Sequence, residues 1–262
     1  MMEHKQDLPA AKNPGIGNPF LGFIMALQFL TVTPDFLRRI FTPLELGQAT
    51  AFFPLAGFVL GLALLGANEL LIRLFLAPVT AGLVLALWVV LTGALHLDGF
   101  LDTCDGLLGG SMPESRLEIM KDERVGAFAL AGGVLLLLLK FAALASLPSR
   151  SFALLVAPVS GRLGMTLAIF AYPYARREGL GRAMKDNTGV WQVIMAGMTA
   201  LVVAWLSAGW LGLFSIGLAF LMVWLGASFT LRRIPGLTGD IYGALNELIE
   251  LVVLLAFLAV AR

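Results

Sequence analysis

The chain alternates long apolar segments with short polar connections. Seven mostly apolar segments are about twenty residues long, namely 50–67, 77–97, 126–147, 151–172, 189–209, 211–231 and 241–261. A helix of that length crosses the roughly 30 Å hydrocarbon core of a bilayer. The apolar stretch 20–33 is shorter, so it either spans, re-enters or lies at the interface. The pattern predicts an all-α fold, a polytopic integral membrane helical bundle of about 7–8 transmembrane helices.

The composition supports this class. The chain is 59% hydrophobic and 13% charged, whereas roughly 25% of the residues of soluble domains are charged. No polar segment is long enough to form a separate globular domain, so residues 20–262 are expected to form a single membrane-embedded domain. Residues 1–19 form a polar N-terminal tail without the apolar core and cleavage site of a signal peptide. A net charge of +1 gives no reason to expect a nucleic-acid partner.

Basic residues predict the orientation of the bundle, because positively charged connections stay in the cytoplasm. If 20–33 spans, the connections 34–49, 98–125, 173–188 and 232–240 share one side. Eleven basic residues lie there: Arg38, Arg39, Arg116, Lys121, Arg124, Arg176, Arg177, Arg182, Lys185, Arg232 and Arg233. The other side has five: Lys5, Lys12, Arg73, Arg150 and Arg262. The first side, with its acidic motifs, is therefore predicted to face the cytoplasm.

The stretch HLDGFLDTCDG, residues 96–106, concentrates negative charge directly after an apolar segment. Asp98, Asp102 and Asp105 are spaced i, i+4, i+7, which places three carboxylates on one helical face. Such a cluster repels itself unless a cation binds, and oxygen ligands favour Mg²⁺, Mn²⁺ or Ca²⁺ over zinc. Bound Mg²⁺ is often completed by substrate phosphates, so the motif indicates phosphoryl chemistry. A solvated acidic loop would not require the same-face spacing.

His96 precedes these carboxylates at the predicted membrane boundary. It fits three roles: a general base, a residue that orients a carboxylate, or a hydrogen-bonded interfacial histidine.

A second acidic set lies in GLTGDIYGALNELIE, residues 236–250, where Asp240, Glu247 and Glu250 share a helical face. Glu247 and Glu250 enter an apolar span, and carboxylates at membrane depth are costly and usually functional. The other interpretation is structural pairing with Lys140 or Arg162, which lie within other predicted spans.

Basic groups form a third set in RLEIMKDERVG, residues 116–126, and YARREGLGRAMKDNTG, residues 174–189. Guanidinium groups beside a carboxylate site are suited to binding a pyrophosphate and to stabilising the negative charge on a phosphoryl group during its transfer. The topology of the membrane alone also produces such positive connections.

Four of these stretches together resemble the cobalamin synthase (adenosylcobinamide-GDP ribazoletransferase) family: TGALHLDGFLDTCDGLLGG at 92–110, RLEIMKDERVGAF at 116–128, YARREGLG at 174–181 and GLTGDIYGALNELIE at 236–250. FLTVTP at 29–34 and FFPLAGFVLG at 52–61 are similar to its N-terminal pattern, although FLTVTP lacks the basic residue expected there. The resemblance covers the chain from about residue 20 to its end.

The resemblance implies a Mg²⁺-dependent transferase in the bacterial inner membrane with its active site facing the cytoplasm. It would join adenosylcobinamide-GDP to α-ribazole, or to α-ribazole 5′-phosphate, and release GMP. We expect Asp98, Asp102 and Asp105 to bind Mg²⁺, with Asp240 and Glu247 as further ligands or orienting groups. His96 or one of the aspartates would act as the base. The residues expected to contact phosphate or the guanine nucleotide are Arg116, Lys121, Arg124 and Arg177. A homo-oligomer, or a complex with other cobalamin pathway enzymes, is compatible with this family.

Two other functions fit part of the pattern. A membrane phosphotransferase of the CDP-alcohol type would also use a cluster of carboxylates to bind a cation. The chain lacks two parts of the sequence signature of that class, the alanine-arginine pair and the later paired aspartates. An ion-coupled transporter would use Glu250, Lys140 and Arg162 as a relay. The charged residues of a transporter would be distributed across the thickness of the bilayer, whereas the acidic sets are predicted to cluster at one side.

Overall fold

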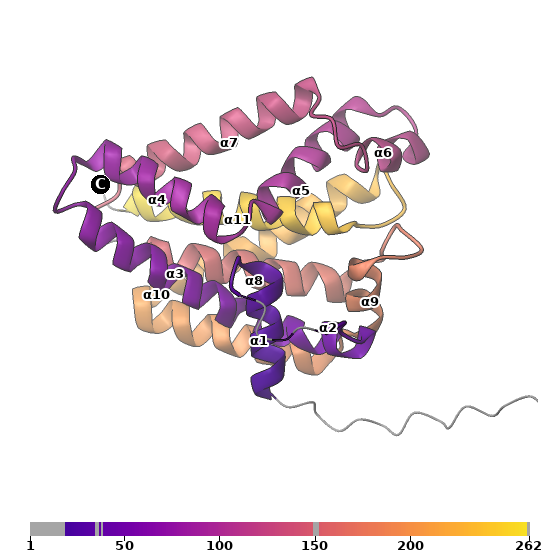
Figure 1. Cartoon of the computed structure of the whole chain (residues 1–262), viewed down its shortest axis with the longest axis horizontal. Helices are drawn as coiled ribbons and strands as arrows, with labels where there is room; N and C mark the ends of the chain where they lie inside the picture. The colour runs from indigo at the N-terminus through magenta and orange to yellow at the C-terminus, as the bar shows by residue number, and fades with distance from the viewer. Residues whose placement is uncertain (1–18, 35–36, 38, 149–151, 261–262) are drawn as a thin grey trace, which may run out of the picture.

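The computed structural model describes residues 19–34, 37, 39–148 and 152–260, which leaves the tail outside it except for Pro19 (Figure 1). The described chain is helical, and its one β feature is an isolated bridge between Tyr174 and Leu237. The helices are α1 (Pro19–Leu30), α2 (Pro43–Ala49), α3 (Phe53–Leu71), α4 (Ala77–Leu91), α5 (Leu95–Cys104), α6 (Pro113–Ile119), α7 (Ala127–Ser146), α8 (Ala153–Ala171), α9 (Leu180–Asn187), α10 (Val190–Leu231) and α11 (Gly239–Val260), with a 3-10 turn η1 (Thr50–Phe52) and a π-helical turn η2 (Asp105–Gly109). The predicted all-α class is confirmed.

Helix α8 is the centre of the bundle. Nearly all of its residues are buried, and it packs against α3, α10 and α11. These long helices lie side by side along the longest axis of the molecule (Figure 1). The sequence of α8 is apolar or small around most of its circumference, as expected for a helix that has no side facing lipid. Gly57 of α3 lets the two backbones meet, because a side chain there would collide with the Pro158 carbonyl.

The predicted membrane class is supported by the length of the helices. Five helical segments of the described chain are long and apolar enough to cross a bilayer: Pro43–Leu71, Ala127–Ser146, Ala153–Ala171, Val190–Leu231 and Gly239–Val260. Helices α4 and α5 together form a sixth candidate, bent by 90°. The short stretch predicted at 20–33 is the 12-residue helix α1.

Helix α10 accounts for two of the predicted spans. Its 42 residues would extend about 63 Å if straight, twice the thickness of a bilayer core. Gly209 interrupts it with a φ of 54°, a conformation that glycine adopts at little cost. Trp205 and Trp210 meet edge to face across this break, with ring centroids 5.3 Å apart. The segments predicted at 189–209 and 211–231 are thus its two arms, which brings the spans to the lower end of the predicted number.

The boundary predicted for the span at 77–97 is wrong. Helix α4 ends at Leu91, and the chain turns before α5 because Gly93 and Ala94 both adopt left-handed conformations, with φ of 57° and 56°. Glycine tolerates this conformation, whereas alanine pays a steric cost of roughly 1–2 kcal/mol. The turn directs α5, and the acidic motif that it carries, away from the axis of α4.

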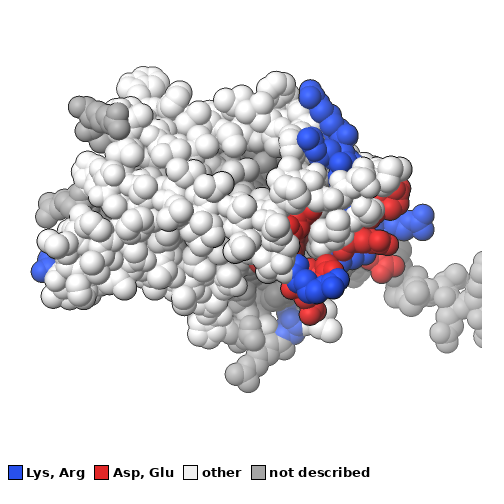
Figure 2. Space-filling model, turned by 90° about the horizontal axis from the view of Figure 1, so that it is seen from above, with Lys and Arg blue, Asp and Glu red and all other residues white. Residues whose placement is uncertain are grey.

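Two glycines place α5 directly against α11. A side chain at Gly99 would meet the Asp240 backbone at about 3 Å, and one at Gly243 would meet the His96 backbone at 3.2 Å. The two acidic stretches of the sequence are therefore held together by close backbone packing. Charged side chains seen from above gather at one end of the molecule (Figure 2), which is the end that carries α6 and α9 in Figure 1.

Candidate active site

The three aspartates of α5 and η2 line one pocket of about 210 Å³, which we call the acidic pocket. Asp98, Asp102 and Asp105 share it with residues from the connection between α6 and α7, including Lys121, Asp122, Glu123 and Arg124. The prediction that these carboxylates share a helical face is thereby confirmed. The last of them begins a π-helical turn, a local widening that is frequent at functional sites.

The three carboxylates differ in what they bind. Both oxygens of Asp105 accept backbone hydrogen bonds, from Gly126 N at 2.6 Å and from Ala129 N at 2.8 Å, so this side chain caps the first turn of α7. Asp98 is exposed and Asp102 is half-buried, and neither forms a hydrogen bond or an ion pair with the described part of the chain. Asp98 and Asp102 are therefore the carboxylates with free binding capacity.

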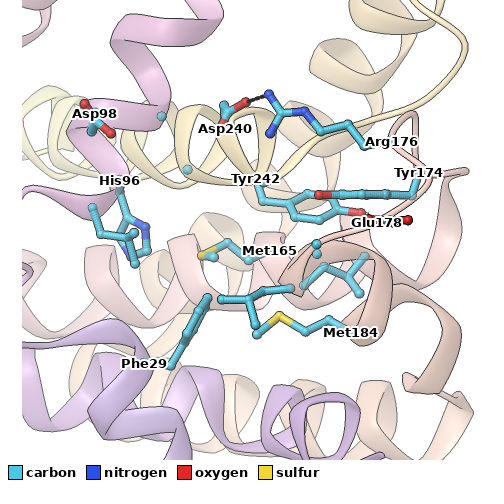
Figure 3. Close-up of a pocket in the computed structure, with 18 residues that line it drawn as sticks. Phe29, His96, Asp98, Met165, Tyr174, Arg176, Glu178, Met184, Asp240 and Tyr242 are labelled. Atoms are coloured by element: carbon cyan, nitrogen blue, oxygen red, sulfur yellow. Dashed lines mark hydrogen bonds and ion pairs between the residues drawn. The ribbon is translucent and has the colours of Figure 1, made fainter. Parts of the chain in front are cut away.

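Figure 3 shows a second hollow of about 300 Å³, the large pocket. Asp98 lines both this pocket and the acidic pocket. Residues of α1, α5, α8, α9, α11 and the connection after α8 line the large pocket. Those that matter for its chemistry are Phe29, His96, Met165, Ile169, Tyr174, Arg176, Glu178, Met184, Asp240 and Tyr242. Asp98 stands where the two pockets meet.

His96, Arg176 and Tyr242 line the large pocket, and each has a buried polar atom without a partner in the described chain. His96 is 1% exposed and Tyr242 is 2% exposed. The His96 Nε2 atom and the Tyr242 hydroxyl form no hydrogen bond with the described residues. Buried polar atoms are almost always paired, so each unpaired one calls for an explanation. His96 and Tyr242 both line the large pocket, so a small movement of either side chain would bring its unpaired atom against a ligand.

Asp240 lies at the start of α11 and is held by Arg176. The guanidinium donates to the carboxylate at 2.6 Å, and the Thr238 hydroxyl donates to it at 3.1 Å. Sequence analysis selected the neighbouring Arg177, which is exposed and lines neither of the two pockets. The sequence gives no signal that separates these adjacent arginines, because the choice depends on the path of the chain after α8. Tyr174 and Glu178 of the same connection were missed for this reason, and Tyr242 of α11 was missed because its burial depends on packing against other elements.

Three other basic residues were predicted to contact phosphate, and they differ in whether a protein partner already binds them. Arg116 donates to the carbonyls of Gly110 and Arg233, so it connects the segment after η2 to the segment after α10. Arg124 binds Asp122, and this hydrogen bond lowers the pKa of the Asp122 carboxyl to about 2. Lys121 lines the acidic pocket and forms no ion pair with the described residues. Lys121 is the free cation of the acidic pocket within the described chain.

Glu247 lies in a buried network within the bundle. Lys140 of α7 donates to Glu247 at 2.5 Å and to Glu250 at 2.6 Å, and Arg162 of α8 also binds Glu250. Two buried cations thus face two buried carboxylates, as the interpretation of structural pairing predicted for Glu250. The Lys140 ammonium also lies 4.8 Å from the Trp88 ring centroid, a cation–π contact. Glu250, Lys140 and Arg162, the residues considered for a transporter relay, each bind another member of this network.

Within the described residues, no group of three or more His, Cys, Asp or Glu side chains is arranged to hold a metal ion. Asp105, Asp240 and Glu247 are engaged by backbone amides, Arg176 and Lys140, respectively. Of the predicted ligands, Asp98 and Asp102 are the two without a partner in the described chain, and the unpaired Glu123 lines the same pocket.

Fold and site define a polytopic helical membrane protein with an acidic, two-pocket site at one end of its bundle. The model of the family "Cobalamin-5-phosphate synthase" matches residues 22–258, and the chain belongs to this family. Curated relatives named adenosylcobinamide-GDP ribazoletransferase include those of Desulforamulus reducens, 41% identical over 88% of this chain and 93% of the relative, and Pseudomonas savastanoi pv. phaseolicola, 44% identical over 90% and 98%. The relative from Pseudomonas syringae pv. syringae is 45% identical over 90% and 98%. No solved structure matches the chain significantly.

Proposed function

We propose that the two pockets at the charged end of the bundle bring adenosylcobinamide-GDP and α-ribazole, or its 5′-phosphate, together at Asp98. The chain has the activity for which its relatives are named, the transfer that completes cobalamin or its 5′-phosphate and releases GMP. The observation that supports the location is that Asp98 lines both pockets. Two substrates bound side by side there would present their reacting groups to one another.

The residues of the acidic pocket fit Mg²⁺. This ion is usually bound through one or two protein carboxylates and completed by waters and substrate phosphates. Asp98 and Asp102 supply two carboxylates without protein partners, and we assign the ion to them. Asp105, Asp240 and Glu247 are left out of this ligand set because each already has a strong partner. Bound Mg²⁺ would offset the charge on the phosphoryl oxygens and on the departing GMP.

The described side chains then have distinct tasks in the transfer. A ribose hydroxyl of α-ribazole attacks the phosphorus that is attached to cobinamide, a new P–O bond forms, and the P–O bond to GMP breaks. The hydroxyl proton passes to a base beside the reacting groups, either His96 of the large pocket or one of the two unpaired aspartates. Lys121, the free cation of the acidic pocket in the described chain, neutralises charge on the diphosphate.

The protein is expected to lie in the bacterial inner membrane with this site facing the cytoplasm. The support is the excess of basic residues in the connections at the charged end. A water-soluble, phosphorylated substrate would reach the site from that side. A homo-oligomer or an assembly with other enzymes of the pathway is a further expectation for the bilayer-embedded chain.

Metal removal tests the proposal directly. Purified protein in lipid nanodiscs is given adenosylcobinamide-GDP and α-ribazole 5′-phosphate, and GMP and corrinoid product are quantified. We expect equal amounts of both products with Mg²⁺, none with EDTA, and recovery when Mg²⁺ is restored. Undiminished turnover in EDTA would refute the role of the metal. No GMP from a folded sample would refute the activity itself.

A further inference from the structure

The large pocket has an apolar floor that the transfer chemistry does not explain. Phe29, Met165 and Met184 line it below the level of His96 and Asp98 (Figure 3), and Ile169 also lines the pocket. Met165 is 4% exposed, and Met184 is 2% exposed. Methionine side chains adapt to irregular shapes and make favourable contacts with aromatic rings. This floor suits a flat, apolar group.

Aromatic rings form one wall of the same space. Tyr174 and Tyr242 lie 6.1 Å apart between ring centroids, tilted by 33°, and both line the pocket. Aromatic groups prefer offset or edge contacts with rings at such separations. At about 300 Å³, the pocket is at the lower limit of ligand-sized cavities, so it can hold a bicyclic base but not a corrinoid ring system.

The polar groups of the pocket match one base better than another. The dimethylbenzimidazole of α-ribazole carries a single acceptor nitrogen and no donor, and the unpaired Tyr242 hydroxyl can donate to such an atom. Guanine would bring several donors and acceptors against Phe29, Met165 and Met184, where they would stay unpaired at considerable cost. Arg176 is bound to Asp240 through one terminal nitrogen and keeps one unpaired buried donor, its Nε, while Glu178 lies at the exposed rim.

We propose that the large pocket is the subsite for the base of α-ribazole, with Met184 and Tyr242 as its specificity-determining residues. This inference rests on the proposed function. The apolar bicyclic base lies on the methionine floor, its ring nitrogen accepts from Tyr242, and the ribose points to His96 and Asp98. The guanine nucleotide is left to the acidic pocket with Lys121 and Arg124.

The test measures the KM for α-ribazole and the KM for adenosylcobinamide-GDP separately in each variant. Met184→Phe narrows the floor, and we expect the KM for α-ribazole to rise about tenfold while the KM for adenosylcobinamide-GDP stays within about twofold. The matched control is Met198→Phe, the same change at an exposed position of α10, which should leave both constants unchanged. A rise in the KM for adenosylcobinamide-GDP instead would assign the pocket to the guanine nucleotide and overturn the proposal.

Tyr242→Phe removes only one hydroxyl, so it keeps the test decisive if Met184→Phe fails to fold. The probe is an indole analogue of α-ribazole, which lacks the acceptor nitrogen. Wild-type protein should prefer α-ribazole over this analogue by about fivefold, and Tyr242→Phe should abolish that preference. A preference that survives in the variant would refute the hydrogen bond. GMP release by wild-type protein shows independently that the proposed function holds.

Discussion

Four carboxylates at the charged end of the bundle have different surroundings. Asp98 and Asp102 have no partner in the described chain, Asp105 accepts from two backbone amides, and Asp240 is held by Arg176. A carboxylate with a strong protein partner serves the fold, because its removal leaves that partner unpaired. A carboxylate without one is free for a ligand. Substitutions at these similar residues should therefore have different consequences.

At Asp102, replacement by Asn should remove activity and keep the fold. The carboxylate has no partner to lose, whereas the proposed ion loses half of its protein ligands. We expect GMP release to fall by about 100-fold or more, as for other losses of charge stabilisation at a reacting phosphoryl group. Far-ultraviolet circular dichroism should be unchanged. Asp186→Asn, at an exposed position of α9, is the control, and full activity of Asp102→Asn would remove Asp102 from the metal site.

At Glu250, the expected effect is on stability. Its carboxylate faces both Lys140 and Arg162 at full burial, so Glu250→Gln leaves buried positive charge without compensation. Breaking such a buried pair costs about 3–5 kcal/mol, and thermal unfolding in detergent should begin at a clearly lower temperature. The control is Glu118→Gln, at an exposed position of α6. Equal stability of the two variants would show that the network does not hold α7, α8 and α11 together.

Among the helices and turns, η2 and α7 are linked through Asp105. The carboxylate lies 21 residues before Gly126 in sequence, yet it takes the place of a local capping side chain, which the glycine at that position cannot provide. It also places negative charge at the positive end of the α7 dipole. The π-helical turn and the start of α7 are thus fixed to one another, which closes one side of the acidic pocket.

Asp105→Ala should therefore loosen the first turn of α7. Losing a helix cap costs about 1 kcal/mol, so the amides of residues 126–129 should exchange hydrogen faster, while those in the middle of α7 should not. Hydrogen–deuterium exchange with mass spectrometry measures both regions in one experiment. Asp122→Ala, which removes a surface ion pair nearby, is the control. Unchanged exchange at residues 126–129 would mean that the cap contributes nothing.

The whole molecule has two unlike ends. Charged side chains gather at the end with α6 and α9, and the α3–α4 connection lies at the opposite end (Figures 1 and 2). The distribution of basic residues predicts that the charged end faces the cytoplasm.

Labelling of cysteines in intact cells tests this orientation. In a Cys104→Ala background, Arg73→Cys in the α3–α4 connection should react with a membrane-impermeant maleimide from outside. Lys121→Cys, in the acidic pocket, should react only after the cells are permeabilised. The reverse pattern would place the active site outside and contradict the proposed arrangement.

The sequence by itself determined the features that depend on local repeats. The length of the apolar segments predicted α7 and α8 to within two residues at each end, and the spacing of the aspartates predicted their shared helical face. Both follow from the fixed rise and turn of a helix, which need no knowledge of distant residues. The family resemblance added the chemistry, since its motifs lie in the connections at the charged end.

Only the tertiary structure decided which side chains meet. Arg176 rather than Arg177 reaches Asp240, 64 residues away, and Lys140 binds Glu247 across 107 residues. The break before α5 depends on the left-handed backbone of Ala94, which its residue type disfavours. These outcomes depend on how α5, α7, α8 and α11 pack. Packing contacts between distant residues offset the desolvation of buried charges and the strain of the turn, and no local sequence pattern contains those contacts. The two pockets that meet at Asp98 arise from that packing.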